Sequence, residues 1–165
     1  GGDGAMDAGN ILKPRLARSG LSNVHPQLIA HERDTKIKRL ASKVDRVLVD
    51  APCTGLGALR RRPEARWRRT PADVAPLAKL QRELLASAIR LTRPGGVVLY
   101  ATCSPHLAET VGVVSDALRR QPVTALDTRE LFCPVDDLGP GPYVQLWPHR
   151  HGTDAMFAAA LRKDT

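Results

Sequence analysis

The chain has 165 residues, of which 42% are hydrophobic but only 4% aromatic, and its formal net charge at pH 7 is +8. This length predicts a single domain, whose core must consist mainly of aliphatic side chains. No segment reaches the roughly 18 consecutive apolar residues that a membrane-spanning helix needs, so no such helix is predicted. Three cysteines are too few for a disulfide scaffold and lack metal-site spacing, so the sequence predicts free thiols, no metal and a cytoplasmic location.

The first part of the chain carries the weakest structural signal. Residues 1–10 are polar and Gly-rich and are interpreted as a flexible lead or a cloning scar. Residues 11–165 are expected to form one domain, which begins with a short helix that ends at Gly20. A strand is predicted from Gln27 to Ala30, and residues 35–43 form a polar connection with one or two helical turns.

A strand, a helix and a second strand follow. Residues 44–50 form a nearly continuous apolar run, as in a strand that is buried on both faces. Thr70 opens the helix, with Pro71 in its first turn and Asp73 in the position of a capping box. The apolar positions of this helix recur at steps of three and four: Val74, Leu77, Leu80, Leu84, Ala88 and Leu91. Residues 97–102 form the second strand, and since such crossovers are right-handed, the two strands should be parallel.

The remaining sequence predicts one more helix and a hairpin. Ser104 and Pro105 have the pattern of a helix cap and first turn. The buried stripe of this helix is predicted at Leu107, Val111, Val114 and Leu118. Residues 143–148 and 155–161 are interpreted as the two strands of a terminal hairpin, in spite of the alanines in the second. The expected fold class is therefore α/β.

Two of the three cysteines directly follow the predicted parallel strands. Because ligands bind at the carboxyl edge of parallel sheets, Asp50, Cys53 and Cys103 should face one pocket. The thiolate is the reactive form of cysteine, and a helix N-terminus directly after Cys103 is expected to favour it. A carboxylate and two thiols suit covalent catalysis on an electron-poor ring. Equally open is the alternative that the two cysteines have no chemical role and only fill space at the strand ends.

The positive charge is concentrated in residues 60–69, RRRPEARWRR, which hold six arginines and one glutamate. Arginines beside an aromatic ring are typical of nucleic-acid binding, since they contact phosphates while the ring stacks on a base. A solvated arginine-rich loop is the alternative. The candidate RNA-binding residues are Arg60, Arg61, Arg62, Arg66, Trp67, Arg68 and Arg69.

From Val44 to about Leu161 the sequence resembles the Fmu/Sun (RsmB-type) family of ribosomal RNA cytosine-C5 methyltransferases. The matching stretches are DRVLVDAPCTGLGALRRRPEARW (45–67), RPGGVVLYATCS (93–104) and GTDAMFAAAL (152–161). The third match is weaker, because the family usually has glycine where Ala155 stands. The resemblance implies a Rossmann-like methyltransferase sheet, S-adenosyl-L-methionine as cofactor and ribosomal RNA as partner.

The resemblance also implies a role for each residue at the sheet edge. Cys103 would attack C6 of cytosine, so that C5 becomes nucleophilic and takes the methyl group. Cys53 would help to remove the C5 proton and release the enzyme. Asp50 would contact the base or the cofactor and assist protonation at N3, while Pro52 would shape the loop against the base and adjoin the cofactor. The target base would have to leave its stack to reach Cys103.

The chain departs from the family pattern in its first part. A Gly-rich cofactor loop of the type D-x-C-A-x-P-G-G-K-T and the acidic residue that holds the ribose are missing, so a catalytic domain truncated at its N-terminal strands is expected. Residues 11–34 resemble the region after the second strand, which makes His31 a candidate cofactor contact or, alternatively, a solvated loop residue. A sheet without its first strands exposes an apolar edge, through which self-association is expected. Residues 1–43 hold four of the six lysines but only four of the 19 arginines, which suggests a fragment or a fusion of two related sequences.

Two other functions remain open. An RNA-binding fragment without catalysis is consistent with the missing cofactor loop. A cysteine hydrolase would require a base beside Cys103, and His106 is the nearest candidate. At the start of a helix, however, the ring of His106 is expected to point to solvent.

Overall fold

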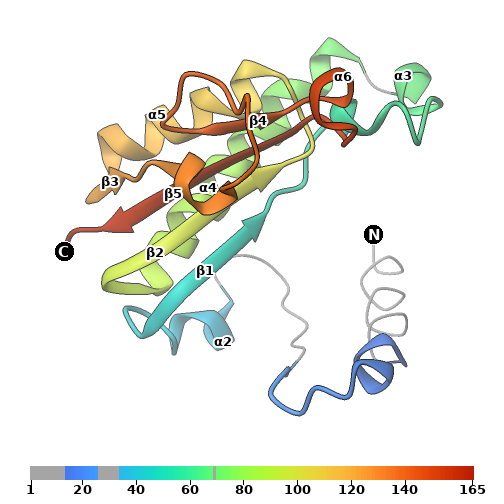
Figure 1. Ribbon diagram of the computed structural model, residues 1–165. Helices are drawn as coiled ribbons and strands as arrows, with labels where there is room; N and C mark the ends of the chain where they lie inside the picture. The colour runs from blue at the N-terminus through green and yellow to red at the C-terminus, as the bar shows by residue number, and fades with distance from the viewer. Residues whose placement is uncertain (1–13, 26–33, 69) are drawn as a thin grey trace.

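The computed structural model describes residues 14–25, 34–68 and 70–165 of the chain. These residues form a five-stranded sheet in the order β1-β2-β5-β3, with β4 paired to β5 (Figure 1). The strands are β1 Val44–Asp50, β2 Thr92–Thr102, β3 Val123–Ala125, β4 Val144–Leu146 and β5 Met156–Lys163. The longer helices are α4 Val74–Leu91 and α5 Val111–Arg120, and the short ones are α2 Thr35–Lys38, α3 Ala65–Arg68 and α6 Pro148–His151. The predicted α/β fold class is confirmed.

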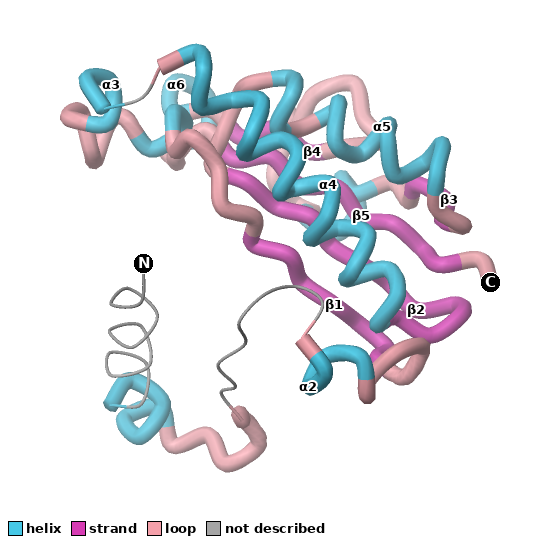
Figure 2. The backbone as a smooth tube through the Cα atoms, turned by 180° about the vertical axis from the view of Figure 1, so that it is seen from behind, coloured by secondary structure: helices cyan, strands magenta, loops and turns pink. Residues whose placement is uncertain are grey.

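The β1–α4–β2 unit has the predicted form. β1 and β2 are parallel, with Asp50 opposite Ala101. Before α4 the chain makes one 3-10 turn, Pro71–Asp73, and Thr70 and Asp73 form the predicted capping box. α4 then lies beside α5 on one face of the sheet (Figure 2). Because the two strands are parallel, their carboxyl ends meet at the same edge of the sheet.

The buried side of α4 differs in part from the predicted one. Leu85, Ala88 and Ile89 are buried in the core, whereas the predicted Leu80 and Leu84 are only half-buried. α4 contacts both the sheet and α5, so its buried side is turned partly toward the sheet and partly toward α5. A count of apolar steps along one helix cannot include the direction of that second neighbour.

β1 is more exposed than predicted. Its residues are half-buried or exposed, and Leu48 is 66% exposed. Val47 and Val49 pack against the core beneath α4, whereas Leu48 points to the opposite face. Within the described residues β1 pairs only with β2, so neither its outer edge nor its second face is covered. Self-association through this edge stays a prediction.

The last strand lies inside the sheet. β5 is antiparallel to β2 on one side and to β3 on the other, and it also pairs with β4, which confirms the predicted hairpin. Residues 158–160, all alanine, are buried, because core clusters lie on both faces of β5: one includes Leu85 and Val113, and the other Leu138 and Val144. Burial and strand pairing thus override the helical propensity of alanine.

α5 begins later than predicted. Leu107–Glu109 form a separate 3-10 turn, and Thr110 has a non-helical conformation before α5. The turn and the helix are therefore out of phase, so the predicted Leu107 and Val111 are exposed, by 72% and 39%. The fully buried positions of α5 are Val113, Val114 and Ala117.

The N-terminal predictions are tested only in part. Residues 14–19 are helical, and Gly20, with φ +70°, ends this helix as predicted. The lead over residues 1–10, the strand from Gln27 to Ala30 and the candidate His31 lie outside the described residues. In the part of the chain that the structure describes, no helix has the length and apolar character needed to cross a membrane.

Candidate active site

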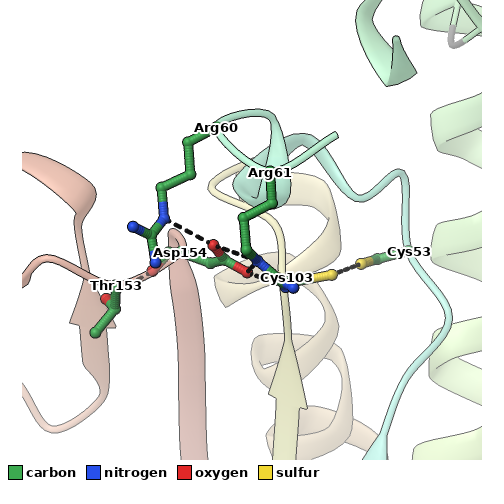
Figure 3. Close-up of polar contacts among 6 residues, drawn as sticks. All are labelled: Cys53, Arg60, Arg61, Cys103, Thr153 and Asp154. Atoms are coloured by element: carbon green, nitrogen blue, oxygen red, sulfur yellow. Dashed lines mark hydrogen bonds and ion pairs between the residues drawn. The ribbon is translucent and has the colours of Figure 1, made fainter. Parts of the chain in front are cut away.

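Cys53 and Cys103 lie against each other at the carboxyl edge of the parallel strands. Their sulfur atoms are 3.2 Å apart (Figure 3). The pairing of β1 with β2 continues one residue beyond Asp50, because the Ala51 N–H donates to the Ala101 carbonyl at 3.0 Å. All three cysteines of the chain are free. The predicted meeting of the two cysteines at one edge is confirmed, while their chemical roles stay predictions.

The backbone of the Cys103 loop is held by Gly57. The Gly57 N–H donates to the Cys103 carbonyl at 2.9 Å, and the Gly57 carbonyl accepts from the Ala155 N–H at 2.8 Å. A Cβ atom on Gly57 would lie 2.0 Å from the Ala155 oxygen and 2.7 Å from the Cys103 oxygen. Only glycine therefore allows this turn to bridge the loop after β2 and the start of β5.

The contact between the sulfur atoms gives the two thiols unequal acidity. A hydrogen bond from Cys53 lowers the pKa of Cys103 from its ordinary value of 9.0 to about 7, against the opposing effect of burial. The same bond and the burial of Cys53 raise the pKa of Cys53. At neutral pH a large share of Cys103 is therefore thiolate, while Cys53 keeps its proton.

The source of this acidity is not the predicted helix N-terminus. Between Cys103 and α5 lie seven residues, which include only the short 3-10 turn Leu107–Glu109. The favourable dipole of a helix falls off within its first turn, so α5 is too far along the chain to act directly on the sulfur. The neighbouring thiol replaces the helix as the stabilising group.

Alkylation of Cys103 by iodoacetamide should be half-maximal near pH 7, since the rate follows a thiolate fraction that rises with pH through the pKa. Cys53→Ala removes the donor and should move this midpoint to higher pH, whereas Cys53→Ser keeps a hydroxyl donor and should move it less. Peptide mass spectrometry would measure each site, with the exposed Cys133 as internal reference. Coincident midpoints for wild type and Cys53→Ala would contradict the assignment of Cys53 as donor.

A cavity of about 750 Å³ opens beside the two cysteines. Its lining residues come from the loop after β1, the loop after β2 and the basic stretch: Asp50, Ala51, Pro52, Cys53, Thr54, Gly55, Ala58, Arg61, Arg62, Glu64 and Cys103. The predicted Asp50 and Pro52 are both exposed to this space. Six of the predicted site residues therefore share one cavity: Asp50, Pro52, Cys53, Arg61, Arg62 and Cys103.

The basic stretch divides into two parts. Arg60 and Arg61 both donate to the carboxylate of the buried Asp154, Arg61 through a bidentate pair at 2.5–3.1 Å (Figure 3). These contacts lower the pKa of Asp154, chiefly through the hydrogen bonds from Arg61.

The second part of the basic stretch is exposed. Arg62 and Arg66 are exposed, and Trp67 is 83% exposed with the Arg66 guanidinium 5.6 Å from its ring centre. The candidate Arg69 lies outside the described residues, and of the adjacent Arg68 only the helical backbone is described.

Sequence reasoning missed two buried carboxylates of the site. Glu109 is fully buried and accepts hydrogen bonds from residues beside both cysteines, and Asp154 holds Arg60 and Arg61. Asp154 stands in the GTD motif, but its sequence position gives no sign of its arginine partners. Glu109 falls near the start of the helix predicted after Ser104, where an acidic residue is ordinary.

His106 is not placed as a base for Cys103. Its ring is exposed, and Nδ1 accepts a hydrogen bond from the Ala108 N–H at 3.1 Å. The prediction that this ring points to solvent is confirmed. The geometry therefore gives no support to a cysteine hydrolase.

The motifs of this site have counterparts in known proteins. The family model described as 16S rRNA methyltransferase RsmB/F matches residues 10–162 of the chain. The chain belongs to the RsmB/F methyltransferase family. This match spans both cysteines, the basic stretch and Asp154, so the whole candidate site lies inside the family region.

Relatives with sequence similarity are longer than this chain. A Mycobacterium tuberculosis protein named as a methyltransferase is 85% identical over 122 residues, which are 73% of this chain and 27% of that protein. The ribosomal RNA small subunit methyltransferase B of Thermus thermophilus is 38% identical over 82% of this chain and 34% of its own length. The tRNA (cytosine(72)-C(5))-methyltransferase of Pyrococcus horikoshii is 32% identical over 92% of this chain and 37% of its own length. The chain thus spans between 27% and 37% of the length of these relatives.

Solved structures share the fold. The crystal structure of PH0851 superposes with a TM-score of 0.82 at 35% identity, over 92% of this chain and 34% of that one. The structure of NSun6 from Pyrococcus horikoshii with SFG has a TM-score of 0.78 at 30% identity, over 93% of this chain and 38% of that one. The predicted Rossmann-like methyltransferase sheet is thereby confirmed.

Proposed function

We propose that the protein methylates C5 of a cytosine in ribosomal RNA, with S-adenosyl-L-methionine as methyl donor and a covalent intermediate on Cys103. The observation that carries this proposal is the pair of sulfur atoms, 3.2 Å apart, in one cavity with the Asp50 carboxylate. A thiol of lowered pKa suits the nucleophile, and a second thiol beside it suits the later proton transfer.

The first step forms a carbon–sulfur bond. The Cys103 thiolate donates an electron pair to C6 of the base, and the C5–C6 π electrons move toward N3, which takes up a proton. We assign the assistance of this protonation to Asp50, which is exposed in the same cavity. C5 then has the electron density of an enamine and can take a methyl group.

The second step breaks the same bond. Cys53, whose own proton has first passed to solvent, accepts the proton from C5 as a thiolate. The electron pair of the C5–H bond restores the C5–C6 double bond, the Cys103 thiolate leaves, and N3 returns its proton to Asp50. The largest cause of the raised pKa of Cys53 is its hydrogen bond to Cys103. Once the Cys103 sulfur is bonded to carbon, it carries no negative charge, so this cause disappears and Cys53 becomes more acidic. Cys53 therefore becomes more acidic only after Cys103 has bonded to the base.

The described residues fit one side of a cofactor site. The exposed Asp50 carboxylate stands at the carboxyl end of a parallel strand, where α/β sheets bind ligands, and the cavity has the size of a small-molecule site. S-adenosylmethionine would supply the electrophilic methyl group there, and SFG, present in the NSun6 structure, is its analogue. Asp50 and Pro52 would hold its near side, and His31 stays a candidate contact.

The exposed part of the basic stretch forms the proposed RNA-binding rim. Arg62 lines the cavity, and Arg66 and Trp67 are free to meet phosphates and an unstacked base. Arg60 and Arg61 are already paired with Asp154, so we assign them to the shape of the rim as well as to RNA contact.

Methyl transfer tests the proposal directly. Incubation with small-subunit ribosomal RNA and methyl-labelled S-adenosylmethionine should yield labelled 5-methylcytidine after digestion to nucleosides. Label at another position, such as N4 or a ribose oxygen, would contradict the proposed chemistry. Calorimetric titration with S-adenosylmethionine separates the two causes of an absent product, which are failure of cofactor binding and failure of catalysis.

An RNA-binding fragment without catalysis is the second candidate. It is favoured by one observation, namely that Arg62, Arg66 and Trp67 are exposed and need no cofactor to contact RNA. In that case RNA should bind through the rim with strong salt dependence, while no S-adenosylmethionine binds and no label is transferred.

A further inference from the structure

Glu109 connects the two cysteine loops through one buried carboxylate. Its side chain is 0% exposed. On the side of β1, Oε1 accepts from the Thr54 N–H and Oε2 from the Thr54 hydroxyl, both at 2.8 Å. On the side of β2, Oε2 accepts from the Ser104 hydroxyl. Thr54 directly follows Cys53 and Ser104 directly follows Cys103, so one carboxylate holds the neighbours of both sulfur atoms.

A third element completes this network. Gln81, fully buried on α4, donates through Nε2 to Glu109 Oε1 at 3.2 Å and to the Pro52 carbonyl at 2.8 Å. The backbone carbonyl of Glu109 accepts from the Tyr100 hydroxyl at 2.7 Å. Both cysteine loops are thereby fixed to α4 and β2, which are among the most buried elements of the fold.

A buried carboxylate needs such partners, because an uncompensated charge in the interior is strongly unfavourable. Burial raises the pKa of Glu109, but the hydrogen bonds from Ser104 and Thr54 outweigh it, and the pKa of Glu109 is lowered overall. The carboxylate is therefore ionised at neutral pH and accepts all four hydrogen bonds that reach it. Glu109 does not line the cavity that holds Asp50 and the cysteines, so it acts through its partners and not on a substrate.

We propose that Glu109 is the positioning residue of the cysteine pair, which fixes the distance between Cys53 and Cys103 by binding the loop that carries each. The inference rests on the proposed function only in naming these cysteines as the reacting pair. Without the carboxylate, the donors of Thr54, Gln81 and Ser104 lose their common acceptor. The backbone bond from Gly57 to Cys103 remains, but the segments next to the two sulfur atoms are no longer held together. The proton transfer by Cys53 and the attack by Cys103 need both sulfur atoms at one base, so this distance is what catalysis depends on.

The effective concentration of one thiol at the other reports how closely the two are held together. It can be measured without RNA or cofactor. In a Cys133→Ser background, a glutathione buffer oxidises only this pair: two thiols and one glutathione disulfide give one protein disulfide and two glutathione molecules. Glu109→Ala should lower the effective concentration at least about 10-fold, since freely moving groups lose proximity. Glu109→Gln keeps an acceptor oxygen and the side-chain shape, so it should recover most of this loss.

A matched control separates positioning from general destabilisation. Thr128 is fully buried, and its hydroxyl oxygen accepts a hydrogen bond from the Ala160 N–H of β5 at 2.9 Å, so Thr128→Ala removes a buried polar contact outside the cysteine loops. It should leave the effective concentration unchanged. If Glu109→Ala does not fold, Ser104→Ala removes the hydrogen bond on the side of β2, and Thr54→Val removes one of the two on the side of β1. Each should lower the value.

Two results would overturn the proposal. One is an effective concentration within about twofold of that of the background protein in Glu109→Ala, or in both Ser104→Ala and Thr54→Val. The other is an equal loss in Thr128→Ala. Because this measurement involves no methyl transfer, a protein that fails the RNA methylation assay can still show the Glu109 effect, and the two proposals fail separately.

Discussion

Replacing Cys103 with serine is expected to lower the rate of RNA methylation at least about 10³-fold, because the serine hydroxyl stays protonated at neutral pH and cannot replace the thiolate. In the native site the hydrogen bond from Cys53 lowers the pKa of Cys103 to about 7, so the nucleophile is ready without a separate base. The rate would be measured as labelled 5-methylcytidine formed in small-subunit ribosomal RNA under single-turnover conditions.

The matched control is Cys133→Ser. Cys133 is exposed and is absent from the residues that line the cavity, so this variant should keep the wild-type rate. RNA affinity should also be unchanged in Cys103→Ser, since the proposed rim of Arg62, Arg66 and Trp67 is intact. A Cys103→Ser protein that methylates within tenfold of wild type would mean that Cys103 is not the nucleophile.

The position of the site could be predicted from sequence because it depends on strand direction. The apolar runs at 44–50 and 97–102, separated by one capped helix, admit a parallel pair, and a parallel pair brings its carboxyl ends together. Strand direction alone, without any side-chain detail, therefore predicts Asp50, Cys53 and Cys103 at one edge, and these residues line one cavity in the structure.

The details that failed depend on neighbours that are distant in sequence. The exposure of Leu48 follows from the position of β1 at the edge of the described sheet, and the buried side of α4 follows from its contact with α5. The acidity of Cys103 was attributed to the helix after it, yet it comes from a thiol fifty residues away. Local periodicity carries no information on such contacts.

The two buried carboxylates are a further example. Glu109 and Asp154 look like ordinary surface residues in the sequence, since acidic side chains are usually solvated. Their role becomes visible only with their donors, which come from Thr54, Ser104 and Gln81 in one case and from Arg60 and Arg61 in the other. A buried acidic residue whose partners lie on several loops is therefore a result that only three-dimensional contacts can provide.

Replacing Cys53 with serine should instead leave the covalent step intact and block release, so that a Cys103–RNA adduct accumulates. The serine hydroxyl can still donate to the Cys103 sulfur, so attack on C6 continues, but it is a much weaker proton acceptor than a thiolate. With RNA and S-adenosylmethionine present, the adduct should be at least about tenfold more abundant than in wild type on a denaturing gel.

The double variant gives this prediction its control. Cys53→Ser combined with Cys103→Ser should form no adduct, and mass spectrometry of the digested single variant should find the nucleotide on Cys103. An adduct on Cys53 would reverse the two roles, and the absence of any excess in a preparation that binds RNA would remove Cys53 from the release step. The lowered pKa of Cys103 and the raised pKa of Cys53 favour the proposed order, because the thiol that is ionised first is the one that can attack.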